Sequence, residues 1–441
     1  MFYKVILLFV SLIFFCCHGL SALIYVAGVT VGTYVIGLML EKQRKKSVVV
    51  LGVFLIIGTL LVAKYVNLWF SWGFAVPLGL SYYTLMSVGY LLDVYHGKVK
   101  AERNLFSFAL FLCFFPQVVA GPIGRSGDLL PQWNRKVSIT IDGVRTGFIM
   151  FLTGLFEKFV LADNLAKLTN GIFFEETQYE GLALWIGILL YTLRIYFDFA
   201  GYSLIAIGGA RMLGIQLMEN FKSPLYATSM KEFWRRWHIS LSTWFRDYLY
   251  IPLGGSRVSS IRTDFNLLLV FVMSGIWHGT TIGFFIWGFL HGIYQMIGRH
   301  TGQVRKSFRE KWKLSGTVYI MCQRFLVFLL VSFAFIPFQI TDTGQMLCVL
   351  KNLFVWNPWV LTDETFLSFG LSFSKLVLCT IGIFLVFWID KYNLKNNFYD
   401  SLAKQKFLPR VLFYIILLSG IIFLGVYGND YNAANFVYGQ F

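Results

Sequence analysis

Residues 274–292 of the chain are SGIWHGTTIGFFIWGFLHG, and they place two histidines inside an otherwise apolar stretch of membrane length. His278 and His291 are the only titratable residues of this stretch, and each has a tryptophan shortly before it and a glycine directly after it. An ionisable side chain inside a bilayer is costly unless it is paired or used, so it marks a functional site by default. We therefore expect the functional site to include this pair.

The spacing of the two histidines limits how they can be arranged. They lie 13 residues apart (291 − 278), which is a rotation of about 220° on a straight α-helix. They cannot share one helix face, and the glycines and threonines of 279–283 predict a broken helix or a tight hairpin. A zinc pair of the HExxH type needs histidines at i and i+4, and the stretch holds no Cys, Asp or Glu. We predict no metal site.

The whole chain has the composition of an integral membrane protein. Of its 441 residues, 57% are hydrophobic and 14% are charged, whereas soluble proteins carry roughly a quarter charged residues. Apolar runs close to the roughly 20 residues that span a bilayer recur throughout. Some of the twelve runs are short or broken by glycine and are candidates for re-entrant segments, so we predict an all-α polytopic protein with about 11 transmembrane helices. The runs lie at 3–17, 20–40, 47–66, 76–95, 104–121, 145–163, 182–208, 263–280, 281–298, 317–338, 372–390 and 410–428.

The net charge of +16 is explained by membrane topology, and no nucleic-acid partner is expected. Lys and Arg gather in short connections between the apolar runs, such as 41–46, 231–238 and 299–313. Basic short loops mark the cytoplasmic side of a membrane protein. Residues 3–40 lack the small-residue cleavage site of a signal peptide, so we expect a retained helical hairpin there. We interpret 1–441 as a single membrane-embedded domain in contact with membrane lipids.

The segment 229–257, SMKEFWRRWHISLSTWFRDYLYIPLGGSR, is too polar to span the membrane. Its aromatic residues recur at helical spacing, which predicts one amphipathic helix lying at the cytoplasmic interface. On that helix His238 falls in register with Trp234, Leu241 and Phe245, and so points toward the protein or the acyl region. The segment is either a membrane anchor alone or a part of the site.

Two further stretches depart from plain hydrophobicity. Residues 114–125, FFPQVVAGPIGR, interrupt an apolar run with Pro, Gln and Gly, which indicates a re-entrant loop. Residues 196–203, YFDFAGYS, bury Asp198 among aromatic residues, far in sequence from any obvious cation. A structural and a functional role are equally compatible with this aspartate.

Together these stretches resemble the membrane-bound O-acyltransferase (MBOAT) family. The resemblance is strongest to its bacterial branch, which contains the alginate O-acetylase membrane subunit, the peptidoglycan O-acetylating subunit and the teichoic-acid D-alanyl transferase. It implies a helical bundle with re-entrant and interfacial helices around a central tunnel, a core at about 75–300 and C-terminal helices over 317–441. The motifs that carry it are SYYTLMSVGYLLDVYHGKV (81–99), FFPQVVAGPI (114–123), YFDFAGYSLIAIGGARMLG (196–214), NFKSPLYATSMKEFWRRWHISLSTWFRDYLYIPLGG (220–255) and SGIWHG with LHG (274–292).

The resemblance also implies roles for single residues. The histidine of the WHG motif is the essential one in the family, and it corresponds to His278. His238 matches a second polar residue near the active centre, and His291 a further family histidine. The final residues, FVYGQF (436–441), resemble a C-terminal signature whose tyrosine relays the acyl group, here Tyr438, although Gly439 replaces an aromatic residue. Residues expected to contact substrate or donor are Trp277, Trp234, Arg235, Arg236 and Asp198.

The chemistry implied is transfer of an acetyl group from a cytoplasmic thioester to a hydroxyl outside the membrane. The donor is acetyl-CoA or a carrier-protein thioester, with no tightly bound cofactor. His278 acts as general base, and Lys231, Arg235 and Arg236 meet either the donor's phosphates or lipid headgroups. The hydroxyl belongs to Tyr438, to a partner protein or to an envelope polysaccharide.

The location implied is the bacterial cytoplasmic membrane, and the expected partner is an extracytoplasmic SGNH-type acetyltransferase. Two alternatives stay open at this point. One is a teichoic-acid D-alanyl transferase, and the other is a transporter or flippase in which the histidines relay protons. No inverted repeat supports the transporter.

Overall fold

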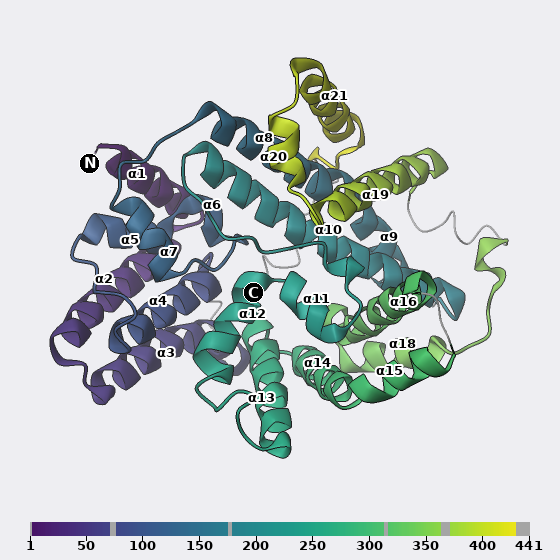
Figure 1. Ribbon diagram of the computed structural model, residues 1–441, viewed down its shortest axis with the longest axis horizontal. Helices are drawn as coiled ribbons and strands as arrows, with labels where there is room; N and C mark the ends of the chain where they lie inside the picture. The colour runs from purple at the N-terminus through teal and green to yellow at the C-terminus, as the bar shows by residue number, and fades with distance from the viewer. Residues whose placement is uncertain (1, 71–75, 175–178, 313–315, 363–370, 429–441) are drawn as a thin grey trace. The chain divides into compact units, whose positions relative to one another are not determined.

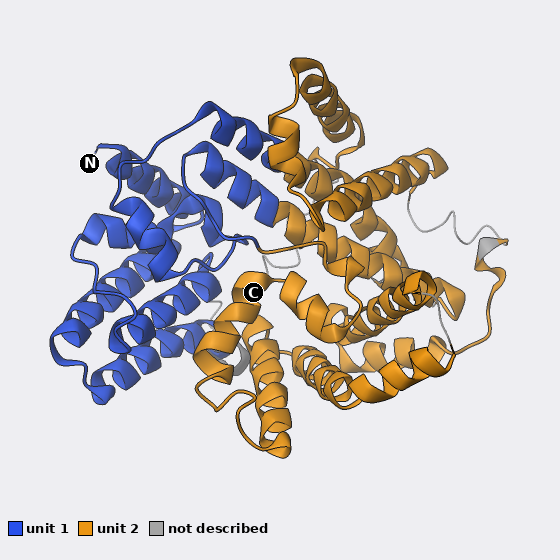
Figure 2. Ribbon diagram, viewed as in Figure 1, with its two compact units in different colours: residues 1–151, 203–219, 441 blue, residues 152–202, 220–440 orange. Residues whose placement is uncertain are grey.

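The computed structural model describes residues 2–70, 76–174, 179–312, 316–362 and 371–428 (Figure 1). Within these ranges the secondary structure is helical and contains no strand. The chain divides into two compact units (Figure 2): unit 1 comprises residues 1–151, 203–219 and 441, and unit 2 comprises 152–202 and 220–440. The interpretation of 1–441 as one domain stays a prediction.

Unit 1 is built mainly from the N-terminal helices. Gly19, in a left-handed conformation with φ 109° that favours glycine, separates its first two helices. The third and fourth helices pack against the second. The helices are α1 (Phe2–Cys17), α2 (Leu20–Gln43), α3 (Lys46–Phe70), α4 (Leu80–Tyr95), α5 (Leu105–Cys113), α6 (Phe115–Val118), α7 (Ser126–Trp133) and most of α8 (Ile141–Leu155). The end of α10 (Leu182–Met212) also belongs to this unit.

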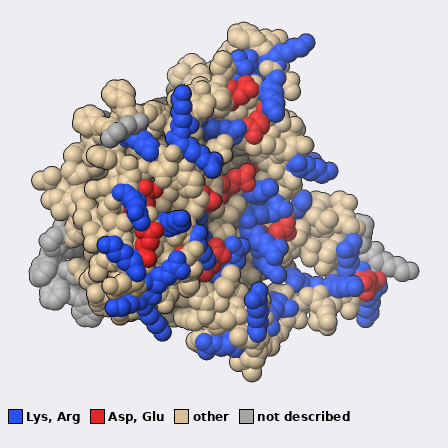
Figure 3. Space-filling view, turned by 60° about the vertical axis from the view of Figure 1, so that its left-hand side comes forward, with Lys and Arg blue, Asp and Glu red and all other residues tan. Residues whose placement is uncertain are grey.

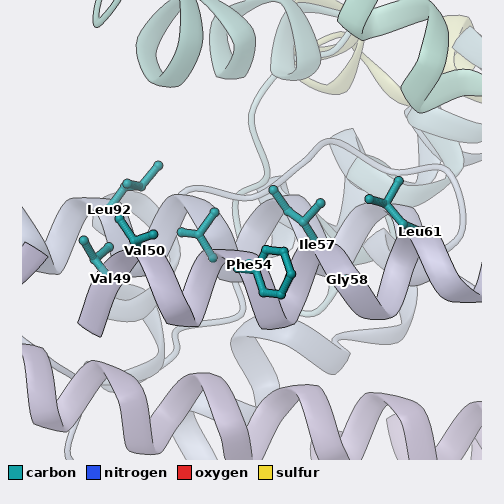
Figure 4. Close-up of a pocket in the computed structure, with 8 residues that line it drawn as sticks. Val49, Val50, Phe54, Ile57, Gly58, Leu61 and Leu92 are labelled. Atoms are coloured by element: carbon teal, nitrogen blue, oxygen red, sulfur yellow. The ribbon is translucent and has the colours of Figure 1, made fainter. Parts of the chain in front are cut away.

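An apolar groove of about 380 Å³ runs along α3 in unit 1 (Figure 4). Its lining consists of aliphatic and aromatic side chains together with Gly58, and one residue, Leu92, comes from α4. A surface of this kind suits hydrocarbon and offers no group to a charged ligand. The groove is therefore not the candidate site.

Unit 2 contains the segments that carry the predicted site. Its N-terminal part is a π-helical segment, Phe156–Ala162, which continues from α8 into α9. The helices that follow are α9 (Asp163–Phe174), the first part of α10, α11 (Met230–Arg236), α12 (Ile239–Phe245), α13 (Ser260–His278), α14 (Ile282–His300), α15 (Gly302–Lys311), α16 (Gly316–Ala334), α17 (Ile336–Gln339), α18 (Thr343–Asn352), α19 (Phe373–Asn393), α20 (Phe398–Ala403) and α21 (Phe407–Leu424).

Six of the described helices are long and apolar enough to cross a membrane. The run predicted at 104–121 is interrupted, because α5 ends at Cys113 and the short α6 follows. The expected number of about 11 spans is therefore not confirmed. The six helices are Leu20–Gln43, Lys46–Tyr65, Leu182–Met212, Gly316–Gln339, Phe373–Asn393 and Phe407–Leu424.

The helices α13 and α14 form a close hairpin in unit 2. Gly275 of α13 and Gly288 of α14 face each other, and a Cβ added to Gly288 would collide with the carbonyl oxygen of Phe271. Only glycine lets two helix backbones approach so closely. This contact fixes how far one helix is shifted along the other.

Candidate active site

The predicted histidine pair lies on the two arms of the α13–α14 hairpin. His278 is the last residue of α13, and His291 lies in the middle of α14. Residues 279–281 make the turn between the helices, so the break predicted from the spacing and the glycines is confirmed. Both imidazoles are buried, with exposed fractions of 1% for His278 and 0% for His291.

Three histidines and three tryptophans form a continuous cluster of rings in unit 2, which we call the His–Trp cluster. Its members in order of contact are His238, Trp277, His278, Trp287, His291 and Trp234. The ring of Trp287 lies between the two hairpin histidines, with its centroid 5.0 Å from each of their rings. Trp277 likewise lies 4.8 Å from His278 and 6.4 Å from His238. The three histidines therefore share one aromatic environment.

The proton position on His291 follows from its hydrogen bond to Trp234. The indole Nε1–H of Trp234 donates to Nδ1 of His291 over 3.3 Å. Because an indole N–H can only donate, Nδ1 of His291 carries a lone pair, and the neutral ring keeps its proton on Nε2. This Nε2–H is buried and has no hydrogen-bond partner among the described residues. His291 thus presents a hydrogen-bond donor at Nε2. This arrangement suits binding of a carbonyl oxygen better than it suits the role of a general base.

His238 lies in a sharp turn between two helices, and the prediction of one continuous helix over 229–257 is wrong. The helices α11 and α12 are separate, and His238 between them has a left-handed φ of 43°. A residue earlier in the sequence stabilises this turn, because the backbone N–H of Ile239 donates to the carbonyl oxygen of Asn220. The predicted register of His238 with Trp234 and Leu241 is therefore lost.

The side chain of Asn220 also fixes the ring of His238. Its Oδ1 accepts from the hydroxyl of Ser240 over 2.8 Å and lies 3.1 Å from Nδ1 of His238. Because this oxygen can only accept, His238 carries its proton on Nδ1 and a lone pair on Nε2. The ring lies outside the membrane-spanning helices, is 1% exposed, and packs edge-on against Phe199. Burial lowers the pKa of His238 to about 3, so the ring is neutral at physiological pH.

A cavity of about 390 Å³ adjoins the His–Trp cluster and shares the side chain of Trp234 with it. Phe271, whose ring is stacked 6.2 Å from that of His291, also lines the cavity. The cavity is also lined by three basic residues, Lys231, Arg235 and Arg246. A cavity with an aromatic wall and several cations fits an anionic ligand with an apolar arm.

The comparisons with known proteins agree with this geometry. Residues 98–339 match the model of the membrane-bound O-acyltransferase family. The chain belongs to this family.

Three relatives place the chain more closely within the family. It is 36% identical to the probable alginate O-acetylase of Pseudomonas aeruginosa, over 85% of this chain and 74% of that protein. It is 31% identical to the peptidoglycan O-acetyltransferase of Helicobacter pylori, over 80% and 74%. A teichoic acid D-alanyltransferase of Bacillus subtilis is 28% identical, over 59% and 68%. The chain is accordingly a multi-pass membrane protein and an acyltransferase.

Only some of the predicted donor-binding residues line the cavity. Arg235 lines the cavity, whereas Arg236 pairs with Glu232 at 2.7 Å and donates to the carbonyl oxygen of Lys222. Among the described residues no ion pair involves Arg235, so its charge is available to a ligand. The sequence did not distinguish Arg235 from Arg236, whereas in the structure only Arg235 lines the cavity.

Asp198 has a cation partner that its sequence neighbours did not reveal. Its Oδ1 lies 2.7 Å from Nζ of Lys158, which also binds Asp163 at 2.8 Å. All three side chains are buried. The adjacent Phe199 packs against His238 of the His–Trp cluster, with ring centroids 4.6 Å apart. The predicted role of Asp198 in substrate binding stays a prediction.

Several residues of the site were missed by sequence reasoning, among them Trp287 and Asn220, and one predicted residue lies outside the described part of the chain. Trp287 was part of the quoted stretch, and its position four residues before His291, which is one helical turn, was the available signal. Asn220 gave no such signal, because its contact with His238 depends on the turn between α11 and α12. Tyr438 lies outside the described residues.

Proposed function

We propose that this acyltransferase moves an acetyl group from a cytoplasmic thioester to a hydroxyl of a cell-envelope polysaccharide or of a partner protein, in the bacterial cytoplasmic membrane. The observation that carries the proposal is the side chain of Trp234, which lines the basic cavity and also belongs to the buried His–Trp cluster. The relatives named as O-acetylases of alginate and peptidoglycan support the acetyl group and the polysaccharide acceptor.

The buried histidines supply acid–base and electrostatic catalysis. His278 takes the proton of the acceptor hydroxyl as its oxygen attacks the thioester carbonyl carbon. The Nε2–H of His291 donates to the carbonyl oxygen, which becomes negative as the C–O bond forms. The C–S bond then breaks, and the proton on His278 passes to the leaving thiolate. The net products are one ester and one thiol.

The cavity supplies binding for the donor. Lys231 and Arg235 meet the phosphates of coenzyme A or of a carrier protein's prosthetic arm, since these are the anionic groups of cellular acyl thioesters. Arg246, which also lines the cavity, is paired with Asp247 at 2.7 Å. The aromatic wall of Trp234 and Phe271 covers the apolar arm on its way to His291. No bound cofactor is required, because the donor is a substrate.

The acceptor lies on the other side of the membrane from the donor. Basic connections on the cytoplasmic side support a donor entrance there. An extracytoplasmic acetyltransferase of the SGNH type, which carries a serine nucleophile, is the partner that would receive the acetyl group before the polysaccharide does. Tyr438 is the alternative relay within this chain.

The test is acetyl transfer by the purified protein in nanodiscs. Wild-type protein supplied with acetyl-CoA releases free thiol and acetylates an added polysaccharide or partner, and His278→Ala abolishes both. His96→Ala serves as the matched control, because His96 is an exposed histidine whose Nδ1 contacts the carbonyl oxygen of Leu92. Normal acetylation by His278→Ala refutes the proposal.

The second candidate is D-alanyl transfer, which the relatives named as teichoic acid D-alanyltransferases favour. The same assay separates the two donors. Turnover of a D-alanyl carrier-protein thioester, with none of acetyl-CoA, would replace acetyl by D-alanyl in the proposal and leave the roles of the histidines unchanged.

A further inference from the structure

The short helix α15, Gly302–Lys311, has a composition unlike that of its neighbours. It carries Arg305, Lys306, Arg309 and Lys311 against a single acidic residue, Glu310. Its sequence gives a net charge of +3 (four basic minus one acidic) within ten residues. α15 follows α14 directly, and its N-cap Thr301 is the C-cap of that helix.

An apolar stripe runs along one side of α15. Val304, Phe308 and Trp312 are spaced four residues apart, so they lie on one face of a helix. All three are exposed, at 67%, 53% and 63% of their surfaces. A lone exposed apolar residue is ordinary, but three in line on a charged helix need a partner.

Three of the four basic residues flank this stripe. At about 100° per residue, Arg305 and Arg309 follow the stripe on one side and Lys311 borders it on the other. Lys306 and Glu310 lie on the opposite side of the helix. Cations at the edges of an apolar face match a membrane surface, where the acyl region lies below and the phosphates lie at the same depth as the cations.

We propose that α15 lies in the headgroup region of the membrane, with Val304, Phe308 and Trp312 inserted between acyl chains and its cations bound to anionic lipids. Charge complementarity selects the anionic lipid, because the excess of basic residues is attracted to a negative surface. The connection to α14, a neighbouring helix with exposed Phe289 and Ile297, holds α15 near the bilayer without a binding step. This surface is separate from the proposed acyl transfer.

The surrounding polar contacts leave the stripe free for lipid. Arg305 donates to the carbonyl oxygen of Gly298, and the guanidinium of Arg309 lies 5.3 Å from the ring centroid of Tyr319. Both contacts tie α15 to adjacent helices of unit 2 through its basic side. Neither contact covers Val304, Phe308 or Trp312. Figure 3 shows that Lys and Arg side chains stand out from a surface that is mostly uncharged.

The proposal is tested by the depth of a fluorophore on each side of α15. Phe308→Cys and its matched control Glu310→Cys are labelled with an environment-sensitive dye, in a background where the cysteines that are not buried are serine. These are Cys16, Cys17, Cys322 and Cys348. The proteins are placed in nanodiscs of neutral phosphatidylcholine, with or without anionic phosphatidylglycerol.

We expect the label at 308 to be quenched by nitroxide-labelled lipid and the label at 310 by acrylamide in water. Anionic lipid should strengthen lipid quenching at 308, and a variant with Arg305, Arg309 and Lys311 changed to Gln should lose this dependence. Equal access of acrylamide to both labels overturns the proposal, as does a 308 label indifferent to anionic lipid. Shielding of 308 only when a soluble protein fraction is added assigns the stripe to a protein partner, which also overturns it. Thiol release from acetyl-CoA, measured in the same nanodiscs, reports on the proposed function separately.

Discussion

Replacing His291 by glutamine and, separately, by leucine distinguishes a hydrogen-bond donor from a general base. The amide nitrogen of glutamine can occupy the place of Nε2 and donate a hydrogen bond, but an amide does not accept a proton at neutral pH. Leucine keeps the bulk and removes the donor. If His291 acts through Nε2–H, glutamine retains much of the activity that leucine loses.

The expected magnitudes follow from the surroundings of the ring. His291 has an exposed fraction of 0% and lies among the rings of Trp234, Trp287 and Phe271, so water cannot replace its donor. Loss of one such donor costs about 10²- to 10³-fold in kcat, which we expect for His291→Leu. His291→Gln loses only the anchoring bond from Trp234, worth about 1 kcal/mol, or roughly fivefold.

Trp234→Phe tests the same reasoning from the other end of the hydrogen bond. It removes the indole N–H and keeps an aromatic ring, so the imidazole can adopt either neutral tautomer. We expect a loss of a few-fold in kcat, on the order of the glutamine variant. Combined with His291→Leu, it should cost little more than His291→Leu alone, because the two residues act as one unit.

The assay is thiol release from acetyl-CoA together with acetyl transfer to acceptor, measured in nanodiscs at saturating and limiting donor. A fall in kcat with unchanged KM identifies an interaction made in the transition state. Equal loss of activity in the glutamine and leucine variants would refute the donor role of His291, as would leucine with full activity. His278→Gln provides the contrast, because a general base cannot be replaced by an amide.

Four further outcomes are expected. Arg235→Gln should raise the KM for acetyl-CoA about tenfold, whereas Arg236→Gln, whose guanidinium is held by an internal ion pair, should not; equal effects would contradict the assignment of the cavity. Lys158→Met leaves two buried aspartates uncompensated and should lower the free energy of unfolding by about 3–5 kcal/mol, seen as earlier thermal unfolding in detergent. Gly288→Ala forces a methyl group against the backbone of α13 and should destabilise the protein by about 1–3 kcal/mol; unchanged thermal stability would mean that the hairpin can open. Burial lowers the pKa of His238 from 6.5 to about 3, so the ring stays neutral in the folded protein, whereas in the unfolded chain it binds a proton below pH 6.5. Acidification from pH 7 to 5 should therefore lower the free energy of unfolding by about 2 kcal/mol. His238→Gln should remove that part of the pH dependence, and an identical pH dependence in both proteins would contradict the assignment.

The hairpin and its histidines could be predicted because the information is local. The 13-residue spacing and the glycines at 279–283 were enough to place His278 and His291 on different helices. Periodicity is reliable where a segment is regular and its neighbours do not override it. The family resemblance, and not periodicity, placed Trp234 and Arg235 near the site, and both line the cavity in the structure.

The errors come from contacts between residues far apart in the sequence. His238 leaves its expected register because Asn220, 18 residues upstream, holds a turn that helical periodicity cannot include. Asp198 lacked a visible cation because Lys158 lies 40 residues away in a predicted span. A charged residue inside an apolar run was the only signal of that pair. Tertiary contacts of this kind override local propensity.

The close packing of Gly275 against Gly288 has a consequence for redesigning the enzyme. Because the two backbones touch, a shift of α13 along α14 would drive backbone atoms into each other, so we expect His278 and His291 to keep their spacing when a bulkier acyl group is offered. Variants with altered acyl-chain preference should therefore carry their changes in the cavity walls around Ser274 and Gln295, where side chains rather than backbones set the space. Selection for longer acyl donors should leave the two glycines untouched.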